Sequence, residues 1–128
     1  MLVRHAEAAA GDPDELRALS PAGEEQARAL AHRIASEHGV DAVLSSPLLR
    51  ARQTADAIAR AAGLDVQSSD LLAPGATVAD VLLAAAAQGD TVVLVGHNPD
   101  CQLIAAELGA VVPHGFPPAG YAVIDLPA

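Results

Sequence analysis

The feature that most constrains the fold of this chain is an alternation of short apolar runs with longer alanine-rich stretches. The short runs are rich in β-branched residues and read MLV, DAVLS, DTVVLVG and YAVIDL. In the longer stretches apolar residues recur every three or four positions, which predicts amphipathic helices over residues 21–37, 47–62, 78–87 and 99–108. Strands that alternate with helices are typical of an α/β domain. We therefore expect a three-layer α/β/α sandwich around a central, mostly parallel sheet.

The apolar runs also differ in where they should lie in that sheet. TVVLV is apolar on both faces, which predicts a central strand covered by helices on both sides. YAVIDL follows the proline-rich segment VVPHGFPPAG, and we expect it at an edge. The sequence of 128 residues contains no repeat and no low-complexity linker, so we predict a single domain over residues 1–128.

Composition excludes several classes of partner. Seven basic residues, all of them arginines, face sixteen acidic ones, and the net charge is −9. Aromatic residues on which bases could stack are scarce, so we expect no nucleic-acid partner. No apolar run reaches the roughly 18 residues of a membrane span and the first residues do not resemble a signal peptide, so we expect no membrane partner. The single cysteine, Cys101, cannot form an internal disulfide, which favours a cytoplasmic protein. The oligomeric state stays open.

Polar residues follow three of the four apolar runs. Arg4 and His5 follow MLV, the segment SSPLLRARQTA follows DAVL, and GHNPD follows TVVLV. Ligands of open α/β sheets bind beyond the carboxyl ends of the strands. We therefore expect these three segments to meet at one edge of the sheet, although they lie far apart in the chain.

The two later segments each predict the start of a helix. Ser46 and Asn98 are suitable N-cap residues, and each is followed by a proline, which is favoured at the first helical position. Helix N-termini carry free N–H groups and a partial positive charge, and such ends bind anions. Arg50 lies one turn into its helix and can reach back, and His97 directly precedes the second cap.

Together these segments predict a pocket for a tetrahedral, multiply charged anion such as phosphate. Arg4 and Arg50 supply forked donors that suit phosphate oxygens. His5 and His97 can serve in either of two ways, since a neutral imidazole is a nucleophile and a protonated one is a donor.

At these residues the sequence resembles the histidine phosphatase superfamily, which also contains the phosphoglycerate mutases. The segments LVRHAEA, LSPAGEEQARALA, LSSPLLRARQTA and VGHNPD are similar to its motifs in order and spacing, over residues 2 to about 100, and most similar to the short, SixA-like phosphohistidine phosphatase branch. The resemblance implies a phosphoglycerate mutase-like fold and a phosphatase with His5 as the nucleophile. It implies that Arg4, Arg50 and His97 bind the phosphate, and that neither a metal nor another cofactor is needed. Asn98, at the predicted start of the last helix, is a further candidate for binding the phosphate.

The resemblance is incomplete at two points. Ala6 stands where the family usually has glycine, and this substitution matters only if the position needs a positive φ. The general acid is not identified: Glu7 and Asp70 are candidates, and Asp80 is the other acid of the stretch that contains Asp70. If the substrate is a phosphohistidine, the leaving imidazole needs little protonation and the acid can be dispensable.

Several functions and side-chain roles stay open. The preferred substrate is a phosphohistidine protein, because the short segment 64–90 leaves little material for a lid. The alternatives are a small-molecule phosphomonoester phosphatase or mutase and, from another class, a non-catalytic phosphate- or phosphoprotein-binding module. Arg17 could line the rim of the pocket or form a surface salt bridge, and His114 could line the substrate entrance. Arg52 should point away from the site, and Cys101 should be a packed residue rather than a nucleophile.

Overall fold

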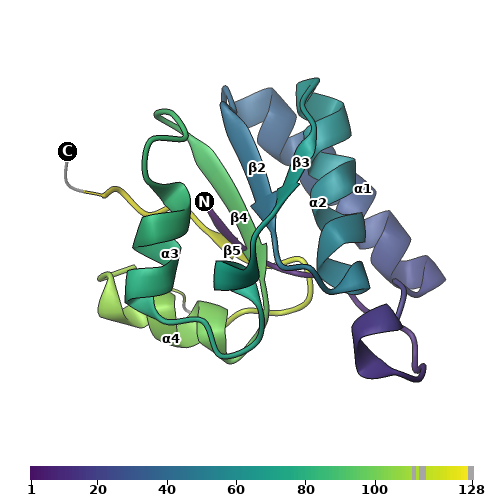
Figure 1. Cartoon of the computed structure of the whole chain (residues 1–128). Helices are drawn as coiled ribbons and strands as arrows, with labels where there is room; N and C mark the ends of the chain where they lie inside the picture. Colours follow the sequence, from purple (N-terminus) through teal and green to yellow (C-terminus); the bar gives the residue numbers. More distant parts are fainter. Residues whose placement is uncertain (111, 113–114, 127–128) are drawn as a thin grey trace.

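The computed structural model describes residues 1–110, 112 and 115–126, which form a layered α/β structure (Figure 1). His114, a candidate for the substrate entrance, lies outside the described residues. The sheet consists of β1 (Leu2–Arg4), β2 (Ala42–Ser45), β3 (Val66–Ser68), β4 (Val92–Gly96) and β5 (Tyr121–Ala122). The helices are α1 (Pro21–Glu37), α2 (Leu49–Ala62), α3 (Val78–Ala85) and α4 (Asp100–Glu107), with two short 3₁₀ turns, η1 (Asp14–Leu16) and η2 (Asp70–Leu72).

The strands are arranged in the order β3-β2-β4-β1-β5. The four strands from β3 to β1 are parallel, and β5 pairs antiparallel with β1. β4 therefore lies in the middle of the sheet and β5 at its edge, which confirms both placements predicted from the sequence. Helices α1 and α2 cover one face and α3 and α4 cover the other (Figure 1), so the expected three-layer sandwich is confirmed.

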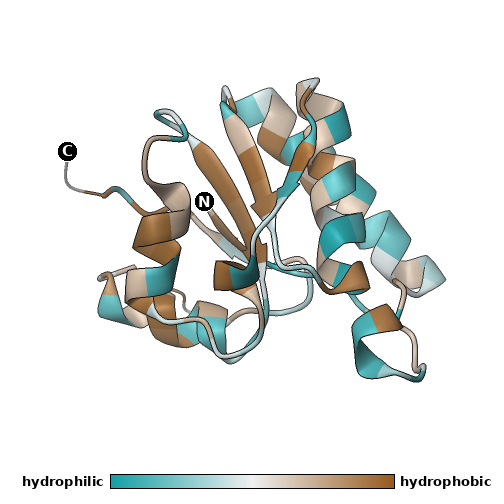
Figure 2. Ribbon diagram, viewed as in Figure 1, coloured by the Kyte–Doolittle hydropathy of each residue, from teal (hydrophilic) through white to brown (hydrophobic). Residues whose placement is uncertain are grey.

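Side chains of the parallel strands alternate between two apolar cores, as the two-residue period of a strand requires. Val3, Val43 and Val93 pack with α1 and α2. Their neighbours Leu2 and Leu94 pack on the opposite face with α3 and α4. The ribbon of β2 and β4 is coloured hydrophobic along most of its length (Figure 2), and all residues of these two strands are buried.

Helix boundaries agree with the sequence prediction best where a local cap defines them. α1 spans the predicted residues, and the Ser20 side chain accepts a hydrogen bond from the Gly23 amide at its start. The predicted start of α2 is wrong by two residues: the helix begins at Leu49 rather than Pro47. α4 begins one residue later than predicted, at Asp100, and α3 and α4 end two and one residues earlier, respectively.

Strand β3 was missed by the sequence analysis. Its sequence, VQS, is short and only Val66 is partly buried, so it lacks the apolar alternation that identifies a strand. It forms because Gly63, at φ 72°, ends α2 in the left-handed conformation and turns the chain back along β2. The strand lies at the sheet edge farthest from β5 and contributes no residue to the site described below.

Candidate active site

The register of the sheet brings the three polar segments to one place. Arg4 lies opposite Gly96, and the His5 amide donates to the Gly96 carbonyl oxygen at 3.0 Å. On the other side of β4, the Ser46 amide donates to the Val95 carbonyl oxygen at 3.0 Å. His5, Ser46 and His97 therefore follow directly on three adjacent strands, as the sequence predicted.

His5 is held with one ring nitrogen free. Its Nδ1 lies 2.7 Å from the Ala6 carbonyl oxygen, and because a carbonyl can only accept, Nδ1 carries the hydrogen. Nε2 is then left with a lone pair in the neutral ring. Burial lowers the pKa of His5 below its ordinary value of 6.5, and the charges of Arg50 and Arg4 lower it further, while the contact with Ala6 acts in the opposite sense. The ring is thus kept neutral near pH 7.

The residue after the nucleophile candidate fastens the strand to helix α2. The Ala6 amide donates to Thr54 Oγ1 at 3.0 Å, and the Thr54 hydroxyl donates to the Arg50 carbonyl oxygen at 2.9 Å. Ala6 is fully buried and is not among the residues with positive φ, so alanine in place of glycine introduces no backbone strain here. These contacts fix the position of His5 relative to Arg50.

His97 faces His5, with ring centroids 5.2 Å apart and planes inclined by 58°. Its Nε2 lies 2.8 Å from Ser46 Oγ, and the same oxygen accepts a hydrogen bond from the Leu48 amide at 3.2 Å. When the Ser46 hydroxyl donates to Nε2, the neutral His97 ring carries its hydrogen on Nδ1. Ser46 therefore caps a turn before α2 and orients His97, which explains why it does not serve as the helix cap. The buried Nδ1 of His97 has no hydrogen-bond partner among the described residues. Burial, followed by the proximity of His5 and Arg50, lowers the pKa of His97 to about 4.

The two arginines are oriented by backbone carbonyl groups. One terminal nitrogen of Arg4 donates to the Phe116 carbonyl oxygen at 2.7 Å, while its buried Nε has no partner among the described residues. Arg50 is buried, and its two terminal nitrogens donate to the carbonyl oxygen of Asp14 at 2.9 Å and to the Oδ2 of its carboxylate at 3.2 Å. The structure thus brings two guanidinium groups and two imidazoles close together at the carboxyl ends of the strands.

Asp14 is a residue of this site that the sequence analysis missed. Its carboxylate bonds Arg50 on one oxygen and Arg17 on the other, at 3.2 and 3.1 Å. These contacts, of which the one to Arg17 is the stronger, hold the pKa of Asp14 below its ordinary value. Of the two alternatives for Arg17, the structure shows the surface salt bridge. Its charge also contributes to lowering the pKa of His5, and a place at the rim of the site stays a prediction.

The candidate acids and Asn98 occupy different positions relative to this centre. Glu7 and Asp70 are exposed, and in the described part of the chain neither carboxylate bonds to Arg4, His5, Arg50 or His97. Asn98 Oδ1 accepts a hydrogen bond from the Gln102 amide at 3.3 Å, so Asn98 stabilises the start of α4 although the helix proper begins at Asp100. Its Nδ2 donates to the Phe116 carbonyl oxygen at 3.4 Å, which Arg4 also contacts.

The remaining polar candidates lie apart from the site. Arg52 is exposed, as predicted for a side chain on another face of α2. Cys101 is buried at the start of α4, and burial raises the pKa of its thiol to about 12, so it is a packed residue as predicted. Within the described ranges, no three His, Cys, Asp or Glu side chains are grouped in a way that could hold a metal ion.

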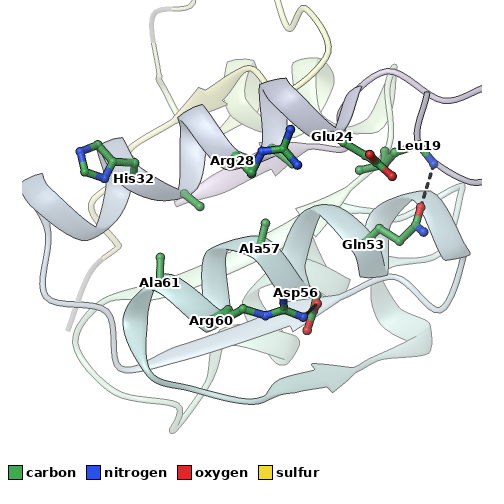
Figure 3. Close-up of a pocket in the computed structure, with 11 residues that line it drawn as sticks. Leu19, Glu24, Arg28, His32, Gln53, Asp56, Ala57, Arg60 and Ala61 are labelled. Carbon is green, nitrogen blue, oxygen red and sulfur yellow. Dashed lines mark hydrogen bonds and ion pairs between the residues drawn. The ribbon is translucent and has the colours of Figure 1, made fainter. Parts of the chain in front are cut away.

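A separate groove of about 590 Å³ runs between α1 and α2 (Figure 3). Alanines line its floor, and the charged side chains of Arg28, Asp56 and Arg60 lie along its sides. None of the residues that line this groove is Arg4, His5, Arg50 or His97. It ends beside Gln53, whose Oε1 accepts a hydrogen bond from the Leu19 amide at 2.7 Å. The groove is therefore a feature of the helical layer and is separate from the candidate site.

Comparison with known protein families identifies the family to which this chain belongs. Residues 1–73 match the Histidine phosphatase superfamily (branch 1), and the chain belongs to this family. The family implies a phosphate-ester substrate. A search of curated protein sequences finds no match. Among the helices that the structure describes, none is both long and apolar enough to cross a membrane.

Solved structures of SixA proteins are similar to most of the chain. The SixA protein of Agrobacterium tumefaciens, assigned as a phosphohistidine phosphatase, is 34% identical with a TM-score of 0.78, over 92% of this chain and 85% of that one. A SixA protein of Nakamurella multipartitia with the same assignment is 34% identical, with a TM-score of 0.71 over 84% and 64% of the two chains. The protein histidine phosphatase SixA in complex with tungstate shares the fold at 23% identity, with a TM-score of 0.79 over 98% and 92%.

Proposed function

We propose that this protein is a phosphatase that removes a phosphoryl group through a covalent phosphohistidine intermediate on His5. The observation that carries the proposal is the pairing of the His5 and His97 rings, 5.2 Å apart, close to the charges of Arg4 and Arg50. A module that only binds phosphate would need the cations but not a neutral imidazole with a free Nε2. The arrangement therefore favours nucleophilic catalysis over simple binding.

Each side chain then has a defined role. The lone pair of His5 Nε2 attacks phosphorus, a P–Nε2 bond forms, and the bond to the leaving group breaks with its electron pair on that group. Water next attacks phosphorus, the P–Nε2 bond breaks, and inorganic phosphate leaves. Arg4, Arg50 and the unpartnered Nδ1 of His97 donate to the phosphoryl oxygens in both steps. Asn98 is a further proposed donor, because the 3.4 Å contact of its amide with Phe116 is long and readily exchanged.

The substrate that we propose is a phosphohistidine carried by a protein. Residues 64–90 are used for β3, η2 and α3, and their side chains Leu72, Val81 and Ala84 belong to the core, so this segment leaves little chain to cover the site. An open site admits a phosphoryl group on a protein surface. The two SixA proteins that are 34% identical to this chain are both assigned to this activity. The leaving imidazole needs little protonation, which fits the exposed positions of Glu7 and Asp70.

A panel of substrates tests the proposal. We would measure kcat/KM for a histidine-phosphorylated protein, p-nitrophenyl phosphate, a sugar phosphate and phosphoglycerate, and trap the protein-bound phosphoryl group after rapid mixing. We expect the phosphohistidine protein to be turned over fastest and an acid-labile, base-stable label to appear on His5. Faster turnover of a small phosphate ester would identify the alternative substrate class. Phosphate binding without turnover of any substrate would identify a binding module and reject the proposal.

We also propose that the reaction needs no metal ion, because two guanidinium groups and the His97 N–H can neutralise the charge of the phosphoryl oxygens. Dialysis against EDTA should leave kcat unchanged, and added Mg²⁺, Mn²⁺ or Zn²⁺ should not increase it. Loss of activity with EDTA and its recovery with one divalent ion would show that His5 and His97 act as ligands instead.

A further inference from the structure

We infer that Asp14 is a built-in competitor of the phosphoryl group for Arg50. This inference rests on the proposed function, in which Arg50 binds the phosphoryl oxygens. In the free protein each terminal nitrogen of Arg50 donates one hydrogen bond to Asp14, one to the carbonyl oxygen at 2.9 Å and one to the carboxylate at 3.2 Å. A phosphoryl group that binds Arg50 through the same N–H groups must first displace Asp14.

The Asp14 carboxylate resembles a phosphoryl group in the way it binds Arg50. A carboxylate offers an arginine a negative charge and two acceptor oxygens, as one edge of a phosphate does. The Arg50 side chain is only 8% exposed, so there is little water to replace a lost partner, whereas the Asp14 side chain is 60% exposed and can be solvated when it leaves. The exchange of one anion for another at Arg50 is therefore feasible without leaving Asp14 as a buried charge.

The loop that carries Asp14 is tied at its base to the rest of the fold, whereas its tip is held only through polar contacts of Asp14. The Ala9 amide donates to the Ala18 carbonyl oxygen at 2.9 Å, and the Leu19 amide donates to Gln53 Oε1 at 2.7 Å. Between these ties, residues 11–16 are all exposed, and η1 buries no side chain. The contacts that hold Asp14 over the site are polar ones to Arg50 and Arg17. The tip can thus move away without uncovering the core.

Two consequences follow for binding. If Arg50 is free of Asp14 in only a fraction of the molecules, the apparent Kd for phosphate is the intrinsic Kd divided by that fraction. Removing the Asp14 charge should therefore tighten the binding of phosphate. The same carboxylate can also return to Arg50 after the reaction, which weakens the binding of the inorganic phosphate product and limits inhibition by it.

The test measures the Kd of inorganic phosphate at pH 8 by titration calorimetry for three single variants. Asp14→Asn keeps the shape of the side chain and removes its charge, and we expect binding roughly 3- to 30-fold tighter, the scale of one charged contact discounted for exposure. Asp12→Asn is the matched control: it removes an exposed charge on the same loop and should change Kd less than about twofold. Arg50→Ala should weaken binding.

A double variant separates competition at Arg50 from repulsion through space. If Asp14 acts by occupying Arg50, Asp14→Asn should give no gain in the Arg50→Ala background. An equal gain in both backgrounds would overturn the inference, as would unchanged or weaker binding in Asp14→Asn with an unaltered thermal melt. If instead Arg50→Ala binds phosphate as well as the wild type, the proposed role of Arg50 fails, and with it the proposed phosphate site.

Discussion

The two sides of the candidate site are built in different ways. On one side, His5, Ser46 and His97 follow three adjacent strands, and backbone hydrogen bonds of about 3.0 Å continue the sheet up to them. On the other side, Asp14 and Arg17 lie on an exposed loop held by side-chain contacts at 2.9 to 3.2 Å. The first side is positioned by the whole fold and the second by a few hydrogen bonds and ion pairs of arginine side chains.

This difference separates two requirements of a phosphatase. A nucleophile needs a fixed position relative to the phosphorus atom, because small displacements are costly in rate. Access and release need a part that can move, and loops with few buried contacts open at low free energy. We therefore expect substitutions on the strand side to change the chemical step and those on the loop side to change mainly binding.

The largest expected effect is on the strand side, at His5. His5→Ala removes the atom that forms the covalent bond, so turnover and the trapped phosphoryl label should both disappear. The remaining cations should still bind inorganic phosphate, and the circular dichroism spectrum should not change. Substantial turnover by this variant would show that His5 is not the nucleophile.

The next largest effect concerns the two guanidinium groups. Arg4→Ala and Arg50→Ala should each lower kcat/KM by roughly two to three orders of magnitude, the scale of one lost contact to a transition-state oxygen. Arg52→Ala is the control, because Arg52 is exposed on another face of α2 and should retain wild-type kcat/KM. Equal losses for Arg52→Ala and Arg50→Ala would contradict the assignment of Arg50.

The pH dependence of kcat/KM tests whether the His5 ring is kept neutral. Its pKa is lowered from 6.5, chiefly by burial, so the nucleophilic form should persist as the pH falls and be lost only below that value. We expect an acid limb that falls about tenfold per pH unit and has its midpoint below pH 6.5. A midpoint above pH 6.5, measured with a substrate that does not titrate in this range, would show that the charged ring is stabilised in the free enzyme.

The same comparison explains what the sequence could predict. The strand side could be predicted from the sequence, because parallel strands align their carboxyl ends. Residues that follow separate apolar runs therefore had to meet. The details of this side were harder to predict. Ser46 was expected to cap α2, but its hydroxyl bonds His97, which is far away in the chain. Such a choice between a local and a distant partner has no signature in the sequence.

The conformation of the loop side could not be predicted from the sequence, for a related reason. The segment GDPDELR has no apolar period, so its conformation depends on contacts with α2 rather than on a buried face. The spacing of Asp14 and Arg17 permits their ion pair, but nothing local indicates that Arg50 binds the same carboxylate. The sequence left two alternatives for Arg17, and the structure shows the salt bridge with Asp14, while a place at the rim of the site stays a prediction.

The smallest expected effect is on the loop side, at Arg17. Arg17 donates to the Ala9 carbonyl oxygen at 2.9 Å and to Asp14 at 3.1 Å, and the side chains of this pair are 32% and 60% exposed, respectively. Exposed ion pairs contribute little to stability, so Arg17→Ala should shift the melting temperature by less than about 3 °C. Without Arg17, the Asp14 carboxylate has Arg50 as its remaining partner and should occupy it more of the time.

We therefore expect Arg17→Ala to raise KM by roughly two- to fivefold with little change in kcat, as for the loss of one exposed charged contact. Arg28→Ala is a suitable control, because Arg28 forms the same kind of exposed ion pair with Glu25 on α1 and lies outside the site. If Arg17 acts by restraining Asp14, its effect should shrink in an Asp14→Asn background. A fall in kcat instead of a rise in KM would place Arg17 with the residues that act on the transition state and would remove the distinction between the two sides of the site.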